Sequence, residues 1–163
     1  MIEPVADRPW MPGYGLLGAE EGRGLLPWSW AEARLTAARN YWVTTNAADG
    51  RPHTMPVWGV WLGDAFFFST GRQTRKARNL AQRPECVICP ERGDEAVVLE
   101  GRAVEVGDAT TRGGVAAAYR AKYPLGFPAE DPLFRVEPRV VFGLIEQPEA
   151  FSGSATRWTF AST

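Results

Sequence analysis

The feature that most constrains this chain is residues 66–80, where an apolar run gives way to a short polar loop and then to a helix-like segment. The apolar run ends at Ser69 and Thr70, and the helix-like segment opens with two adjacent cations, Arg75 and Lys76. A strand can place such a loop, the first turn of a helix presents free backbone N–H groups, and fixed positive charge completes a site for an anion. The segment therefore predicts a strand, a phosphate-binding loop and a helix over about residues 74–82.

Lys76 is unusual within this chain, which contains 2 lysines against 16 arginines. A compact ammonium differs from a planar guanidinium in how it meets a phosphate, so its use here indicates a specific requirement. The alternative is an ordinary exposed helix start with solvated cations. Because cations near a helix N-terminus oppose the helix dipole, that alternative leaves the pair without a compensating partner.

The composition limits the classes of protein to which this chain can belong. A chain of 163 residues with 45% hydrophobic and 23% charged residues predicts one globular domain with a real core. The net charge of -1 argues against general nucleic-acid binding, so any anion site must be local. We expect no membrane-spanning segment and no signal peptide, and therefore a cytoplasmic protein.

The first part of the chain, residues 1–27, is rich in Pro and Gly and predicts an irregular N-terminal arm that lies over the domain or over a partner. The run from Ser29 to Glu32 has the form of a capping box, which predicts a helix to about Asn40. The expected buried face of that helix consists of Trp30, Ala33 and Ala37.

The rest of the chain, residues 28–163, is expected to form a single mainly β domain with few helices. Turn residues separate short apolar runs, which predict a meander of three strands followed by two further strand pairs. A helix capped by Asp108 is expected over residues 109–121, and a loop over Phe151–Ser154. The strands are expected at 41–46, 52–62, 65–70, 86–90, 96–106, 139–145 and 155–160.

Six or seven mostly antiparallel strands in so short a chain favour a closed barrel over an open sheet. The predicted strands and helices do not alternate along the chain, so a doubly wound nucleotide-binding fold is not expected. Cys86 and Cys89 flank Val and Ile in a predicted strand, which holds them too far apart for a disulfide. We expect neither a disulfide nor a metal there.

Together these segments resemble the pyridoxamine 5′-phosphate oxidase-like family, the FMN-binding split β-barrels, which also includes oxidoreductases that use the deazaflavin F420. The resemblance spans about residues 28–160 and rests on the strand from His53 to Trp58, the Gly63-Asp64 turn, the apolar run ending at Thr70, and the segment Thr74–Leu80. The basic C-terminal signature of the true pyridoxamine phosphate oxidase is missing, so its substrate-phosphate residues cannot be transferred to this chain.

The resemblance implies a set of cofactor-binding residues. Arg75 and Lys76 would hold the cofactor phosphate, and Ser69 and Thr70 would hydrogen-bond the ring or its ribityl chain. It also implies a homodimer with shared sites, in which a residue near the C-terminus would reach the partner's site. The segment beneath the ring would be Met55, Pro56, Val57 and Trp58, and the candidate for the contact across the dimer is Trp158.

The function expected from these features is hydride transfer between a bound flavin-type cofactor and a small organic substrate. The single histidine, His53, leaves no Ser-His-Asp or Cys-His constellation, and the adjacent carboxylates Glu20-Glu21 and Glu130-Asp131 lie in loop-like contexts. The alternative is a flavin- or deazaflavin-binding carrier or sensor dimer without turnover. A third option is a dimeric scaffold that has lost the cofactor.

Two cofactors, F420 and FMN, remain open at this point. Arg72 and Arg78, beside Arg75 and Lys76, could meet the extra carboxylates of the F420 tail. The high ratio of arginine to lysine also suggests a GC-rich genome, which is common among organisms that make F420. Both features favour the deazaflavin over FMN. The catalytic residues and the substrate cannot be assigned from the sequence.

Overall fold

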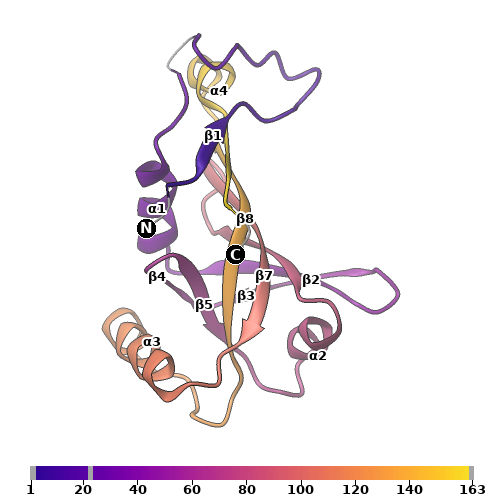
Figure 1. The fold of residues 1–163 in the computed structure, drawn as a ribbon, viewed down its shortest axis with the longest axis vertical. Helices are drawn as coiled ribbons and strands as arrows, with labels where there is room; N and C mark the ends of the chain where they lie inside the picture. Colours follow the sequence, from indigo (N-terminus) through magenta and orange to yellow (C-terminus); the bar gives the residue numbers. More distant parts are fainter. Residues whose placement is uncertain (1–2, 22–23, 162–163) are drawn as a thin grey trace.

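A computed structural model of the chain describes residues 3–21 and 24–161. One antiparallel sheet dominates it, and four helices lie around the sheet (Figure 1). The elements in chain order are β1 (Val5–Asp7), α1 (Trp28–Ala37), β2 (Tyr41–Asn46), β3 (Pro52–Val57), β4 (Val60–Leu62), β5 (Ala65–Ser69), α2 (Arg75–Gln82), β6 (Glu85–Pro90), β7 (Glu95–Glu105), α3 (Ala109–Lys122), β8 (Leu133–Ile145), α4 (Pro148–Ser154) and β9 (Thr156–Thr159).

The strands follow the order β1-β9-β8-β7-β6-β2-β3, and β5 pairs with both β4 and β8. Because β5 pairs with the start of β8, over Leu133–Val136, the sheet curls into a barrel at that end. The barrel is split between β3 and β4, which follow one another in the chain but do not pair. This is the split β-barrel expected from the sequence.

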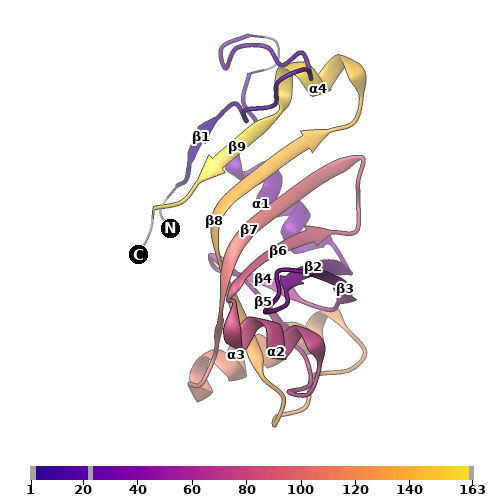
Figure 2. The ribbon, with the colours of Figure 1, turned by 90° about the vertical axis from the view of Figure 1, so that its right-hand side faces the viewer.

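The other half of β8 leaves the barrel. Val140–Gly143 pairs with β9, and β9 pairs with β1, so three strands and α4 form an extension beyond the barrel (Figure 2). The extension and the barrel are therefore two regions of one continuous sheet. None of the helices in the described residues is long and apolar enough to cross a membrane.

The main core lies inside the barrel and continues beneath α1. Its largest fully buried side chains include Trp158, Tyr41, Phe66 and Phe68. Ring contacts continue outward from these residues, with Trp28 of α1 set edge-on against Trp158 at 5.6 Å between ring centroids. A second cluster joins β4 and β5 to α3 through Tyr119 and Tyr123.

The strand count is the main departure from the predicted fold, because the sheet has nine strands and not six or seven. Residues 52–62 form two strands, β3 and β4, which pair with different neighbours. Gly59 lies at the break, where a Cβ atom would stand 2.2 Å from the Phe66 ring. The predicted three-strand meander is consequently wrong, and the segment turns away from β2 after Val57.

The remaining additional strand is β1, which lies inside the arm that was expected to be irregular. β8 also begins at Leu133, six residues before the predicted start at Arg139. The expected loop over Phe151–Ser154 belongs to the helix α4. For β1 and for the start of β8, pairing with distant strands overrides the local preferences of the segments.

Helix α1 also differs from its prediction. It begins at Trp28, its N-cap residue is Pro27, and no side chain caps it, so the capping box at Ser29–Glu32 does not form. The buried residues are Trp28, Ala31 and Leu35, whereas Ala33 and Ala37 are exposed. Packing of Trp28 against Trp61, Trp158 and Phe160 sets the rotation of the helix.

Other local predictions are confirmed. Gly50 and Gly63 have positive φ values of 85° and 67° at the two tight turns. Asp108 caps α3, its carboxylate accepting from the Thr111 backbone N–H at 2.8 Å. Cys86 and Cys89 lie on a strand, β6, as expected.

Candidate functional site

The start of α2 is held by hydrogen bonds that leave its two cations free. Thr74 is the N-cap residue, and its hydroxyl accepts from the Ala77 backbone N–H at 3.3 Å. The Thr70 and Thr74 hydroxyl oxygens lie 3.1 Å apart, which ties the loop after β5 to the helix. The loop and the first turn of α2 are therefore fixed with Arg75 and Lys76 at the first two helical positions.

No carboxylate of the described residues forms an ion pair with Arg75 or Lys76. Arg75 is exposed, and Lys76 is half-buried. Burial lowers the pKa of Lys76, because a buried ammonium loses part of its hydration. Two cations at a helix start without a carboxylate partner form a local positive site suited to an anion.

His53, on strand β3, lies within the electrostatic influence of Arg75 and Lys76. Its pKa is lowered first by partial burial and then by the charges of Arg75 and Lys76. The imidazole therefore lies close enough to both cations to sense them. The pairing of His53 with Thr45, which accepts from the Asn79 side chain of α2, sets this end of β3 beside the helix, although the two elements are separated by more than 15 residues of chain.

β3 is an edge strand, since it pairs only with β2 among the described strands. Its register sets Met55 opposite Val43 and His53 opposite Thr45. Thr45 is fully buried and accepts from the Asn79 side-chain amide of α2 at 2.9 Å. The side of β3 that carries His53 and Met55 is consequently the side on which α2 lies.

The sequence-predicted residues Met55, Pro56 and Val57 all lie on β3, near the positive site. Met55 is 44% exposed, and Val57 is half-buried against the core. The unpaired edge of β3 leaves backbone groups open to a ligand, while Pro56 carries no N–H to offer. An apolar surface beside open backbone groups suits a flat heteroaromatic ring.

Ser69 and Thr70 lie at the end of β5, next to the same loop. The Ser69 hydroxyl donates to the Pro132 carbonyl at 2.9 Å, and the Ser69 backbone N–H donates to the Tyr119 hydroxyl at 3.3 Å. The hydroxyl and the backbone N–H of Ser69 therefore already have hydrogen-bond partners within the chain. Thr70, which is half-buried, is the better placed of the two for a ligand at the α2 start.

Trp58 and Trp158 lie apart from this group. The Trp58 ring stacks on Tyr123 at 4.7 Å between centroids, and its carbonyl accepts from the Tyr119 hydroxyl at 2.7 Å, so it packs against α3. Trp158 is 1% exposed and lies in the main core beside Trp28. The structure thus groups Thr70, Arg75 and Lys76 at the start of α2, with Ser69 behind Thr70, and sets this helix beside β2 and β3, the strand that carries Met55, Pro56 and Val57. The rings of Trp58 and Trp158 pack elsewhere.

Asn79 and Thr45 position the start of α2 against the sheet, and the sequence analysis did not identify them. Their buried hydrogen bond joins α2 to β2 and so fixes the distance between the cations and the sheet. An asparagine in a helix usually faces solvent, and only the pairing of β2 with β3 shows that Thr45 faces α2. Local sequence carries no signal for that contact.

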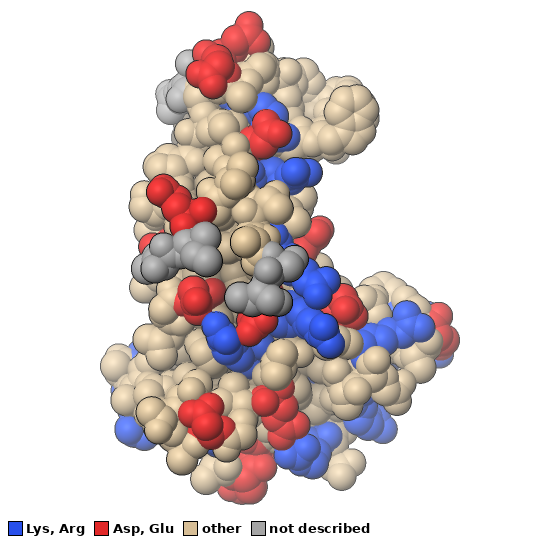
Figure 3. Space-filling model, in the orientation of Figure 1, with Lys and Arg blue, Asp and Glu red and all other residues tan. Residues whose placement is uncertain are grey.

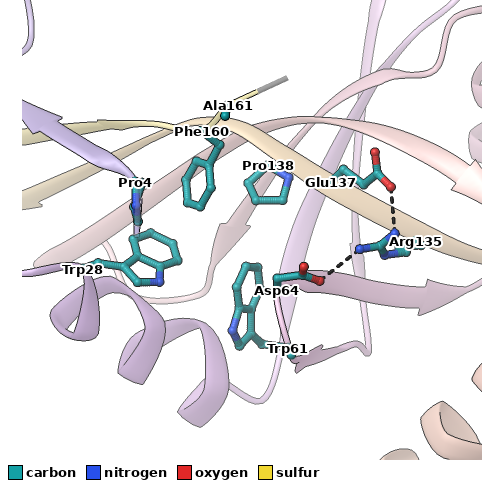
Figure 4. A pocket seen from close by; sticks show the side chains of 10 residues that line it. Pro4, Trp28, Trp61, Asp64, Arg135, Glu137, Pro138, Phe160 and Ala161 are labelled. Carbon is teal, nitrogen blue, oxygen red and sulfur yellow. Dashed lines mark hydrogen bonds and ion pairs between the residues drawn. The ribbon is translucent and has the colours of Figure 1, made fainter. Parts of the chain in front are cut away.

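A pocket of about 290 Å³ lies on another part of the molecule, between α1, the β4–β5 turn and β8 (Figure 4). Trp28, Trp61 and Phe160 line it, and the Arg135 guanidinium at its edge donates to both Asp64 and Glu137. Because its one cation is already paired, this pocket lacks the free positive charge found at α2. The described residues contain no cluster of His, Cys, Asp and Glu that could hold a metal ion.

The family model described as pyridoxamine 5′-phosphate oxidase matches residues 31–142, which is more than half of the chain. The chain belongs to this family. The matched range contains β2 to α2 and therefore every residue of the candidate site. A search of curated proteins finds no match for this member.

Solved structures with the same fold come from proteins of different kinds. A FAD-binding protein from Mesorhizobium loti is 18% identical, with a TM-score of 0.61 over 83% of this chain and 96% of that chain. A protein described as F420 reductase is 19% identical, with a TM-score of 0.55 over 68% of this chain and 94% of that one. HutZ, the heme storage protein from Vibrio cholerae, is 21% identical, with a TM-score of 0.56 over 68% and 86% of the two chains. At these identities the likeness shows the fold alone.

Proposed function

We propose that this protein binds FMN or F420 between the edge of β3 and the start of α2, and uses it to transfer a hydride to or from a small organic substrate. The observation that carries this proposal is the pair of cations Arg75 and Lys76, fixed at the start of α2 without a carboxylate partner. The phosphate of either cofactor would supply the missing negative charge. Family membership and neighbours described as a FAD-binding protein and an F420 reductase support the choice of cofactor class.

The residues present fit such a cofactor in three ways. Arg75 and Lys76 would hold the phosphate, and the Thr70 hydroxyl would bind a polar group next to it. Met55 and Val57 would supply an apolar wall. The open edge of β3 would hydrogen-bond the polar rim of the ring through its backbone. The bound cofactor supplies the hydride chemistry, and the chain binds it, orients it and excludes water from it.

Arg72 bears on the choice between the two cofactors. Its guanidinium donates to Glu105 at 2.8 Å, so it is already paired and is a poor partner for the carboxylates of the F420 tail. Of the two arginines that favoured the deazaflavin, Arg78 alone remains exposed without an ion pair in the described residues. The proposal therefore includes both cofactors.

The test is a side-by-side titration of the purified protein with FMN and F420, followed by fluorescence. We expect saturable binding of one of them at micromolar concentration or below, and spectral recovery when the reduced complex meets a substrate. Hemin belongs in the same titration because a heme storage protein shares the fold. Binding of neither FMN nor F420 would overturn the proposal.

The carrier or sensor remains the second candidate function. His53 is the one histidine of the chain, and partial burial together with the charges of Arg75 and Lys76 lowers its pKa, which favours the neutral imidazole. The cofactor-binding residues named above include no carboxyl group to donate a proton. A complex that binds the cofactor tightly but never reoxidises with a panel of unsaturated substrates would favour this second function.

A further inference from the structure

Residues 8–19, the part of the N-terminal arm that follows β1, are attached firmly to the extension and are called the arm below. The Arg8 guanidinium donates to the carbonyl oxygens of Ala155 at 2.6 Å and Gly153 at 3.0 Å. The Leu17 backbone N–H donates to the Ser152 carbonyl at 2.9 Å. The Tyr14 ring lies 6.1 Å from that of Phe151 on α4. These contacts hold residues 8–19 in one position on α4 and its C-cap residue, Ala155.

The attached arm nevertheless presents a large aromatic side chain to solvent. Trp10 is 87% exposed, the highest value among the exposed large hydrophobic residues of the described chain. Tryptophan buries more apolar area than most residues when it finds a partner, and it is enriched in protein interfaces. A fixed arm with an exposed indole therefore indicates that Trp10 packs against a surface supplied by another molecule.

One face of the sheet is also left without a covering helix in the described residues. α1 packs on the opposite face, so the strands β6, β7 and β8 lie in front of it in Figure 2. The register places a set of apolar residues on the uncovered face. Residues that are paired across neighbouring strands share one face of the sheet, and these residues pair with one another or with the exposed Glu100. They include Trp42, which is 47% exposed, together with Val87, Cys89, Val98, Val140 and Phe142.

The shape of this face is complementary to itself. The arm overhangs it at one end and the β2–β3 hairpin projects at the other, with a hollow between them (Figures 1 and 3). A groove on the same face is lined by the acidic residues Glu85 and Glu100 and by the basic residue Arg139. A two-fold axis would set the hairpin of each copy into the hollow of the other and could bring opposite charges together. The occupant that these features fit is a second copy of this chain.

We propose that, in a two-fold dimer, the arm of one subunit closes the cofactor site of the other and that Trp10 is the residue that covers it. The hairpin seated in the hollow includes β3, which carries Met55 and the open edge of the site. The overhanging arm of the partner subunit then lies against that edge, and its indole supplies an aromatic cover for the ring or for the substrate above it. This inference rests on the proposed function for the identity of the ligand.

A mixed dimer tests whether the arm acts on its own subunit or on its partner. One subunit carries Arg75→Ala and Lys76→Ala, and the other carries Trp10→Ala, with different affinity tags for purification. If the arm acts on the partner, each mixed dimer contains one site with both the cations and Trp10 intact. If it acts on its own subunit, no site of the mixed dimer is intact.

We expect the Trp10→Ala homodimer to bind the cofactor about 10-fold more weakly, as the loss of one aromatic contact implies. The mixed dimer should regain the wild-type affinity at half of its sites. Leu125→Ala, which removes another exposed apolar side chain on the segment between α3 and β8, serves as the control and should leave the affinity unchanged. Wild-type affinity of the Trp10→Ala homodimer, or no recovery in the mixed dimer, would overturn the inference.

A crosslinking experiment decides the arm position without any cofactor. In a Cys89→Ser background, one tagged subunit carries Trp10→Cys and the other Met55→Cys, and a short bis-maleimide is added. We expect a covalent heterodimer, and none when Ala117→Cys on the exposed face of α3 replaces Met55→Cys. A chain that sediments as a monomer, or that gives no crosslink to position 55, refutes the inference. Failure to bind either cofactor together with efficient crosslinking would refute the proposed function alone.

Discussion

The two lysines of this chain occupy opposite kinds of surroundings. Lys122, at the end of α3, donates to the Tyr41 hydroxyl at 2.7 Å, the Gly59 carbonyl at 3.0 Å and the Thr36 carbonyl at 3.4 Å. Lys76, in the first turn of α2, donates to none of the described residues. Both are half-buried, and burial lowers the pKa of each, that of Lys122 to about 8.

The difference separates a structural cation from a binding cation. The ammonium of Lys122 is satisfied by oxygen atoms of β2, the segment after β3 and α1, so it joins three elements of the fold. The ammonium of Lys76 is partly desolvated and receives no hydrogen-bond partner from the described residues. An anion from outside the chain would supply that partner and offset the cost of desolvation. The comparison predicts that substitutions at the two sites affect different properties.

The largest effect is expected for Arg75→Ala combined with Lys76→Ala. Charge-assisted hydrogen bonds are worth about 1.5–3 kcal/mol each, so cofactor affinity should fall by at least about 100-fold. Calorimetric titration of the wild type and the double variant measures it. The melting temperature should remain close to that of the wild type, because neither side chain has an ion-pair partner in the described residues. Retained affinity would contradict the assignment of the anion site.

A smaller effect, on stability, is expected for Lys122→Met. The substitution keeps the apolar stem but removes three hydrogen bonds, and should lower the free energy of unfolding by about 1–3 kcal/mol. Chemical denaturation measures this change, and Lys76→Met is the matched control. We expect the control to weaken cofactor binding and to leave unfolding nearly unchanged. If the two variants behave alike, the distinction between the two lysines is wrong.

The smallest effect is a change in the titration of His53. Its pKa lies below the usual value because of partial burial and the charges of Arg75 and Lys76. A bound phosphate would offset those charges, so cofactor binding should raise the pKa of His53. NMR resolves the shift readily, since the chain has a single histidine. The Arg75→Ala/Lys76→Ala variant should show a raised pKa without cofactor. A pKa that is unaffected by saturating cofactor would place the phosphate elsewhere.

Local sequence was sufficient wherever turn and cap chemistry decides the structure. The hairpin at Gly50, the cap at Asp108 and the start of α2 after Thr74 all depend on residues a few positions apart. The cations at the α2 start could therefore be predicted together with the loop before them. The apposition of β3 could not be deduced from spacing alone and entered through the family resemblance.

Sequence was insufficient where contacts between distant segments decide the outcome. The rotation of α1 follows from the aromatic neighbours of Trp28, which lie more than 30 residues away in the chain. β1 forms only because β9 offers an edge to it. Trp58 and Trp158 have the residue type suited to a cofactor wall, but within the single chain the ring of Trp58 stacks on Tyr123 and that of Trp158 packs against Trp28, which local sequence does not indicate.

The length of β8 has a mechanical consequence. Thirteen residues run from the barrel into the extension, and β7 accompanies them as a paired neighbour with one register shift between Glu100 and Gly101. The register shift bends the two strands locally, and the paired ladder on either side of it joins the barrel to the extension. Because this ladder ties the extension to the barrel, we expect entry and release of a ligand at the α2 start to depend on displacement of the neighbouring loops, and restraint of those loops should slow exchange.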